Sequence, residues 1–120
     1  RGWLPRSEVL DELDASDVLL LPSAYETFGT VALEALARER YVIVSSGCGI
    51  ADWPSLADGI FIASEQNDLT KVLRDMQSLP AVDRIEIART SWRAVRHFNS
   101  QAIDDWLNFL RDAARVSVQY

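Results

Sequence analysis

Apolar and polar stretches alternate along the first half of the chain, and their lengths predict strands and helices in turn. Residues 16–21 end in a continuous apolar run that stops at a proline, which predicts a strand buried on both faces. Further short apolar runs predict strands over residues 41–45 and 60–63. Helices are predicted over residues 7–15, with Ser7 as N-cap, and over residues 30–38. Strands alternating with helices are typical of a parallel sheet with right-handed crossovers.

The second half of the chain has helical periodicity. Its first four apolar positions recur at i, i+3, i+4 and i+7, which predicts an amphipathic helix that Ser78-Leu79-Pro80 breaks. These four positions are Leu69, Val72, Leu73 and Met76.

Two further helices follow in this prediction, over residues 82–97 and 101–115. The segment Phe98-Asn99-Ser100 is expected to separate them, with Ser100 as the N-cap of the last helix. Trp92 and Trp106 have apolar neighbours at helical spacing, so we expect both in the core. The helix over residues 82–97 is also expected to bury Ile85, Ala88 and Val95, and the other apolar positions of the last helix are Ile103, Leu107 and Leu110.

The length of 120 residues suits one domain, with an α/β core over residues 1–65 and a helical tail over residues 66–120. The predicted fold class is α/β: a partial Rossmann-like, three-layer domain with a small parallel sheet of about three strands. The chain begins at Arg1 rather than Met, and the strand at 16–21 has no second neighbour in this sheet. An apolar strand at a sheet edge tends to associate. We therefore expect a fragment of a larger domain whose upstream part is missing.

Composition narrows the class of partner. The net charge of −6 argues against nucleic acid, because binding a phosphate backbone requires a basic surface. The single cysteine, Cys48, excludes an internal disulfide and provides no metal-ligand cluster, and we expect it to be inert. The sequence has no signal peptide, no basic membrane-binding helix and no apolar run near 18 residues, so a cytoplasmic location is expected.

The candidate functional residues lie in the first predicted strand–loop–helix unit. Glu26 follows the strand, and Glu34 interrupts the apolar helix, where an unpaired acid would be costly. Carboxylates can accept hydrogen bonds from vicinal sugar hydroxyls. Gly29 allows the backbone to approach a ligand, and Thr30 can offer its hydroxyl and N–H to a phosphate.

Each of these residues also has a purely structural interpretation. Glu26 could complement the dipole of the following helix, and Glu34 could pair with Arg38 at i+4. Residues 47–49 read Gly-Cys-Gly, which fits a plain turn better than a phosphate-binding loop. His97 lies near a predicted helix end among arginines and is expected at the surface.

The combined pattern resembles a known family. PSAYETFGTVALEALA, preceded by DVLLL and followed by YVIVSSGCGIAD, resembles the C-terminal domain of group 1 retaining glycosyltransferases with the GT-B fold. That family has an acid after a strand ending in Pro-Ser, then Phe-Gly, then a second acid with seven residues between the two, as in Glu26 and Glu34. The resemblance covers about residues 2–65 well and the helical tail loosely.

The resemblance implies a nucleotide-sugar donor site that needs no metal or other cofactor. Glu26 would be the catalytic residue beside the transferred sugar. The backbone N–H groups around Phe28, Gly29 and Thr30 would hold the sugar and diphosphate, and Glu34 would bind the ribose hydroxyls. Helix dipoles and basic side chains would offset the charge of the leaving diphosphate.

The chain departs from the family pattern in two ways. Arg38-Glu39-Arg40-Tyr41 stands where the family often has small-Gly-x-Pro, which could alter the helix C-cap. The family's basic phosphate-binding pair and its N-terminal acceptor-binding domain lie upstream of the matching region, and neither Arg1 nor Arg6 is at a matching position.

The function implied is transfer of a sugar, with retention, from a UDP- or GDP-type donor to a glycan, lipid or small-molecule acceptor. The implied partners are the donor and the missing acceptor domain of a longer parent protein, which could be peripheral to a membrane. The isolated fragment would be inactive or nearly so. The alternative is a truncated, non-catalytic α/β module that packs or self-associates through its exposed sheet edge. A receiver-like signalling domain fits the length but lacks the acidic cluster and phosphoacceptor aspartate that it needs.

Overall fold

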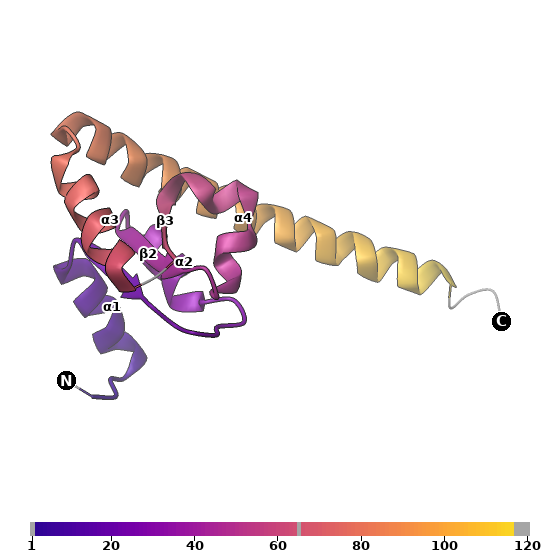
Figure 1. Ribbon diagram of the computed structural model, residues 1–120. Helices are drawn as coiled ribbons and strands as arrows, with labels where there is room; N and C mark the ends of the chain where they lie inside the picture. Colours follow the sequence, from indigo (N-terminus) through magenta and orange to yellow (C-terminus); the bar gives the residue numbers. More distant parts are fainter. Residues whose placement is uncertain (1, 65, 117–120) are drawn as a thin grey trace.

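The computed structural model describes residues 2–64 and 66–116 and has the α/β architecture expected from the sequence (Figure 1). Arg1, the expected domain boundary at residue 65 and residues 117–120 lie outside the described residues. The elements in chain order are α1 (Arg6–Ala15), β1 (Val18–Leu21), α2 (Thr30–Leu36), β2 (Tyr41–Ser45), β3 (Ile60–Ala63), α3 (Gln66–Ser78) and α4 (Ala81–Val116). Two short 3₁₀ helices, η1 (Gly49–Asp52) and η2 (Pro54–Gly59), connect β2 to β3.

The sheet has three parallel strands in the order β1-β2-β3. Val18 of β1 lies opposite Tyr41 of β2, and Val42 of β2 lies opposite Ile60 of β3. The sequence predicted the ends of β2 and β3 correctly, whereas β1 begins two residues later than expected. All the carboxyl ends of the strands therefore lie along one edge of the sheet.

The core forms where α2 packs against β1 and β2, and where α4 packs against α2 and η2. The central strand β2 buries three consecutive residues, Val42 to Val44, because it has a neighbour on each side. The main buried side chains are Leu13, Ala32, Ala35, Leu36, Ile50, Leu56 and Val95.

The edge strands are less buried than the sequence predicted. Leu20 of β1 is 42% exposed, and Ile62 of β3 is 47% exposed. The expectation that β1 is buried on both faces is therefore wrong for this chain. A strand paired on one side only receives less cover from neighbouring elements.

The ends of α1 differ from prediction as well. Pro5, not Ser7, occupies the N-cap position, and no side-chain hydrogen bond caps the helix. A proline next to a helix start is favourable because its missing N–H would have no partner there. Ser7 lies within the first turn of the helix and is exposed.

The helical tail is simpler than predicted. The expected break at Phe98-Asn99-Ser100 is wrong, because α4 is one continuous helix of 36 residues. It contains no proline or glycine, and asparagine and serine weaken a helix only slightly. In contrast, the amphipathic helix α3 is confirmed, with Met76 buried and Leu73 half-buried.

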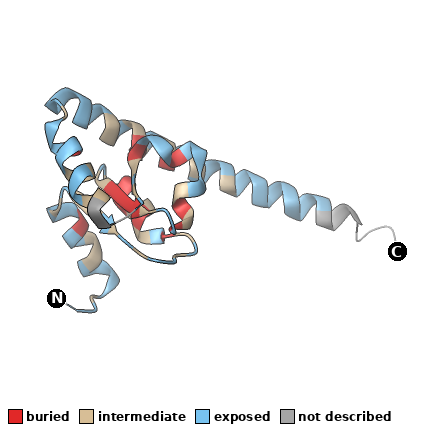
Figure 2. Ribbon diagram, viewed as in Figure 1, coloured by how far each residue is buried: buried red, intermediate tan, exposed pale blue. Residues whose placement is uncertain are grey.

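The two halves of α4 differ in burial (Figure 2). Val95 is buried on the domain, whereas the outer half, residues 102–112, extends beyond it (Figure 1). Trp106 is 66% exposed and Ile85 is 53% exposed, so the prediction that they are core residues is wrong. Trp92 is half-buried, with the guanidinium of Arg96 4.8 Å from its ring centre.

Candidate functional site

Two loops meet at the carboxyl ends of β1 and β2. The backbone N–H of Glu26 donates to the Gly47 carbonyl at 3.1 Å, and Gly49 N–H donates back to the Glu26 carbonyl at 2.9 Å. Ile50 N–H donates to the Phe28 carbonyl at 2.8 Å. Glu26 and Cys48 therefore form an isolated parallel bridge, which extends the strand pairing into the two loops. Backbone hydrogen bonds therefore tie the loop that carries the first candidate acid to the loop after β2.

The glycines in these loops are required by close packing. A Cβ at Gly47 would clash with the Ala24 carbonyl, and a Cβ at Gly49 would clash with the Thr27 carbonyl. This packing supports the interpretation of residues 47–49 as a turn. Cys48 is buried, in agreement with a structural role, and its thiol lies 3.6 Å from the Phe28 carbonyl oxygen.

Gly29 occupies the N-cap of α2 in the left-handed region, with φ of 90°. A Cβ added there would lie 2.9 Å from the Cys48 sulfur and 3.1 Å from a Leu21 methyl carbon. The position thus excludes other residues both by its backbone angle and by its surroundings. Thr30 begins α2 and is exposed.

The half-buried carboxylate of Glu26 folds over its own loop. One of its oxygens lies 3.4 Å from the Thr27 hydroxyl and 3.5 Å from the Phe28 N–H. Both separations are long for hydrogen bonds, so these contacts hold the carboxylate only weakly. Its γ-carbon lies close to Gly29, which places the acid beside the start of α2.

Glu34 has a partner that the sequence did not identify. Its carboxylate lies 2.6 Å from Nη2 of Arg6, and its side chain is only 19% exposed. Arg38 instead pairs with Asp14, so the predicted i+4 pairing of Glu34 with Arg38 is wrong. Four residues separate the helix start from Glu34, which corresponds to a rise of about 6 Å along the axis.

A useful signal for Arg6 existed in the sequence. A mostly enclosed acid needs a cation, and few basic residues precede the third strand. The connection was missed because Arg6 lies outside any motif and the contact joins two helices that are distant in sequence.

Three aromatic rings pack beside the Glu26 loop. Phe28 stacks near Phe98 with ring centres 6.2 Å apart, and Trp53 meets Phe28 edge-on at 6.0 Å. Trp53 and Phe98 are closer still, at 4.9 Å. Trp53 and Phe98 lie outside the motif that carries the family resemblance, so no sequence pattern predicted them at the site.

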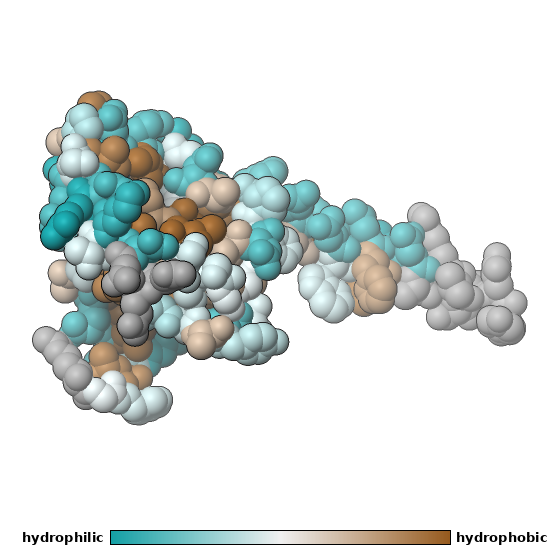
Figure 3. Space-filling view, viewed as in Figure 1, coloured by the Kyte–Doolittle hydropathy of each residue, from teal (hydrophilic) through white to brown (hydrophobic). Residues whose placement is uncertain are grey.

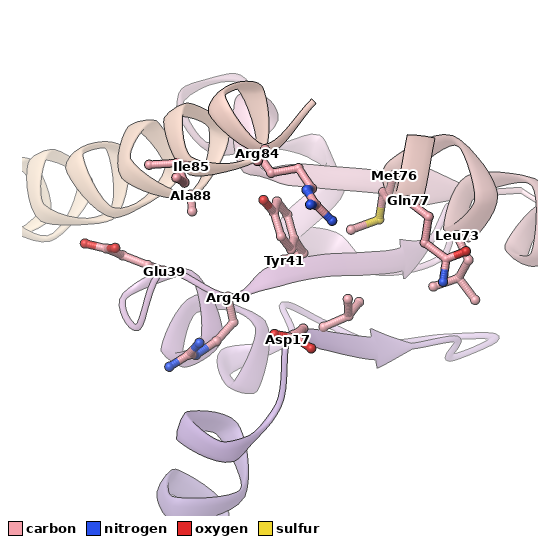
Figure 4. A pocket seen from close by; sticks show the side chains of 12 residues that line it. Asp17, Glu39, Arg40, Tyr41, Leu73, Met76, Gln77, Arg84, Ile85 and Ala88 are labelled. Carbon is pink, nitrogen blue, oxygen red and sulfur yellow. The ribbon is translucent and has the colours of Figure 1, made fainter. Parts of the chain in front are cut away.

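A cleft of about 680 Å³ lies at the other end of the sheet (Figure 4). It opens beside Asp17 and Tyr41, where β1 and β2 begin, and α3 and α4 contribute Met76 and Arg84. Burial raises the pKa of the Tyr41 phenol, Arg84 opposes this effect, and Asp17 adds to it. Because this cleft is at the amino ends of the strands, it is separate from the candidate acids.

The described part of the chain contains neither a cluster of metal ligands nor a membrane-spanning helix. Among residues 2–64 and 66–116, no group of three or more His, Cys, Asp or Glu side chains could hold a metal ion. No helix within the same ranges combines the length and apolar character needed to cross a membrane. His97 is exposed, as expected.

The fold and the loops define an α/β domain with one acid, Glu26, in a loop at the carboxyl end of a parallel sheet and a second, Glu34, on the helix that follows. The carboxyl end is the region where such sheets bind ligands. Residues 1–88 match the family model of glycosyl transferases group 1, and the chain belongs to that family. No curated protein shows significant similarity to the chain. The matched region includes the sheet and both candidate acids and ends within the first half of α4.

Proposed function

We propose that this chain forms part of the donor site of a retaining glycosyltransferase that acts within a longer protein. The observation that carries the proposal is the family match across both acids, Glu26 and Glu34. The reaction would transfer a sugar from a nucleotide-sugar to a glycan, lipid or small-molecule acceptor. Membership of the family supports a nucleotide-sugar as the donor.

In this proposal the residues of the first loop and helix have separate roles. Glu26 accepts hydrogen bonds from hydroxyls of the transferred sugar, for which its weakly held carboxylate is available. The backbone at Phe28, Gly29 and Thr30 holds the sugar and diphosphate. Glu34 accepts hydrogen bonds from the ribose hydroxyls, and the ion pair with Arg6 orients that carboxylate. A metal is not required by this arrangement.

The longer parent would supply the rest of the site. A diphosphate needs positive charge nearby, and the net charge of this chain is −6. We therefore expect the phosphate-binding cations and the acceptor-binding domain to come from upstream segments of the parent. The isolated chain would bind donor weakly and transfer little or no sugar.

The outer half of α4 supports a partner of this kind. Five large apolar side chains there are between 44% and 66% exposed, and four of them recur at i, i+3, i+4 and i+7. Figure 3 shows a hydrophilic upper side of this part of the helix and a less polar lower side. An apolar stripe of this length normally packs against another body. The five residues are Ile103, Trp106, Leu107, Phe109 and Leu110. In the proposal, the acceptor domain of the parent covers them.

The alternative is a non-catalytic module that self-associates. The same stripe and the open edge of β1, where Leu20 is exposed, favour it. Light scattering of the chain, with a double variant Trp106→Glu and Leu110→Lys as control, separates the two. A stable dimer that the double variant abolishes supports the module, and a monomer supports the transferase fragment.

The proposed function is tested by nucleotide binding. Ligand-observed NMR would compare UDP, GDP and ADP, each with and without its sugar, on the wild type, Glu34→Ala and Glu86→Ala. Glu86 is a matched control because it is an exposed acid on α4. Loss of charge-assisted hydrogen bonds costs about 1.5–3 kcal/mol, so Glu34→Ala should weaken binding roughly 10- to 100-fold. Equal weakening by both variants, or no binding by the wild type, would contradict a donor site in this chain.

A further inference from the structure

We propose that Trp53 and Phe98 are positioning residues for the donor site, because their rings hold Phe28 and thereby fix the loop that contains Glu26 and Gly29. The inference rests on the proposed function for its consequence in binding. Its structural basis is independent of any ligand. It also assigns α4, which contributes Phe98, a role in arranging the loop.

The backbone of Phe28 connects the Glu26 loop to the loop after β2. Its backbone carbonyl receives the Ile50 N–H at 2.8 Å, so this residue is bonded directly to the second loop. Its N–H faces the Glu26 carboxylate at 3.5 Å, and the next residue is the left-handed Gly29 that begins α2. A shift of the Phe28 backbone would therefore move both Glu26 and the start of α2.

Two other aromatic rings, those of Trp53 and Phe98, contact the Phe28 ring. Its centre lies 6.0 Å from that of Trp53 and 6.2 Å from that of Phe98, and the centres of these two rings are 4.9 Å apart, so the three rings form a triangle. The edge-to-face and stacked geometries are the ones that aromatic rings favour. Three rings in mutual contact allow little independent movement of any one of them.

Trp53 is held by backbone hydrogen bonds, and Phe98 is held by packing against the core. Trp53 lies at the junction of η1 and η2, where its N–H donates to the Ile50 carbonyl at 3.3 Å and its carbonyl accepts from Leu56 N–H at 3.0 Å. Phe98 packs against the hydrophobic core three residues after the buried Val95. Phe28 itself packs against the core cluster, and the two rings also connect it to the η1–η2 junction and to α4.

The exposure of Trp53 fits a role at a site rather than in the core alone. It is 44% exposed although its ring touches two others. A residue that served only to fill the core would be expected to bury more of so large a side chain.

Amide hydrogen exchange tests the positioning role without a ligand. Gly49 and Ile50 donate their N–H groups to the Glu26 loop, so their exchange rates report whether that loop stays in place. Phe98→Ala should raise these two rates at least about tenfold more than the rate at Val44 in β2, which reports on the core. Phe109→Ala is the matched control, because Phe109 is on the same helix, also contacts a tryptophan, and is 62% exposed.

Nucleotide binding tests the functional consequence. The best-binding member of the UDP, GDP and ADP panel should bind Trp53→Ala about tenfold more weakly than wild type, and Trp53→Phe should restore most of the affinity because it keeps a ring against Phe98.

The outcomes are distinguishable. Selective loosening at Gly49 and Ile50, together with rescue by Trp53→Phe, supports the proposal. Equal changes at Gly49, Ile50 and Val44, or none at any of them, would overturn it. If the wild type binds no nucleotide, the donor site of the proposed function fails, whereas the exchange result still decides the positioning role.

Discussion

The two ends of the parallel sheet are built in different ways. At the carboxyl ends of β1 and β2, backbone hydrogen bonds join the loops, and Gly29 adopts φ of 90° in a space that admits no side chain. At the amino ends, Glu39 also adopts a left-handed conformation, with φ of 58°, but it is exposed and borders an open cleft. The carboxyl end of the sheet packs closely around Gly29. At the amino end, one buried side-chain atom has no hydrogen-bond partner among the described residues.

Arg40 illustrates the looser end. Its Nε is buried without a hydrogen-bond partner among the described residues, whereas the backbone groups around Glu26 are bonded. Unsatisfied buried polar atoms are costly and uncommon. In this chain, therefore, the backbone groups described above at the carboxyl end of the sheet have hydrogen-bond partners, and this is the end where α/β sheets bind ligands.

The largest effect is expected at Gly29. Gly29→Ala would force a side chain into the left-handed region and against Cys48 and Leu21, so it should lower the free energy of unfolding by about 2–4 kcal/mol. Gly2→Ala is the control, because Gly2 has φ of 79° but open space around it. Urea denaturation would measure both, and similar losses in the two variants would contradict a fitted carboxyl end.

The opposite sign is expected at the amino end. Glu39 follows α2, and the next N–H, from Arg40, donates to the Ala35 carbonyl at 3.0 Å, which is a helix-ending pattern that favours glycine at position 39. Glu39→Gly should therefore raise the free energy of unfolding by about 0.5–1 kcal/mol. Arg74→Gly, inside α3, should lower it by about 1 kcal/mol. A loss in Glu39→Gly would show that its left-handed backbone is not strained.

Much of this comparison could be predicted from sequence, and the reasons differ by element. The strand β2 and the helix α3 were located correctly because their apolar periods are unambiguous, and the sequence also placed Glu26 in the loop and Glu34 in the helix. Apolar periodicity identifies a face but not what covers it, which is why Trp106 and Ile85 were wrongly expected in the core.

The remaining errors come from long-range contacts. The pairing of Glu34 with Arg6 and the contact of Phe28 with Phe98 join residues whose separation in sequence no local pattern reveals. Position 39, where the family resemblance led to the expectation of a glycine, is a glutamate in this chain, and its backbone is left-handed all the same.

A smaller effect is expected from Tyr41 at high pH. Its folded-state pKa is raised, chiefly by burial, above the unfolded value of 10.0. The stabilising contribution of the neutral phenol is complete below pH 10 and is lost as pH rises from there through the folded pKa. Tyr41→Phe should therefore lose less stability than wild type when the pH is raised above 10. Denaturation at a series of alkaline pH values would measure this, and parallel profiles would contradict it.

The smallest effect is expected at Arg6. Its side chain is 76% exposed, so its ion pair with Glu34 is screened by water. Arg6→Ala should change the free energy of unfolding by less than about 1 kcal/mol. If thermal denaturation instead shows a loss of several kcal/mol, the largely enclosed Glu34 carboxylate depends on this ion pair, and the screened-pair prediction is wrong.

Chemical-shift mapping on the ¹⁵N-labelled chain tests most directly which end of the sheet binds the donor. A nucleotide-sugar would be titrated while the amides of Glu26, Gly29 and Glu34 are followed beside those of Tyr41 and Arg84. If Glu26 and Glu34 form the donor site, the first three amides shift together with one dissociation constant while the last two stay unchanged. Shifts confined to Tyr41 and Arg84 would place the ligand in the cleft and contradict a donor site formed by Glu26 and Glu34.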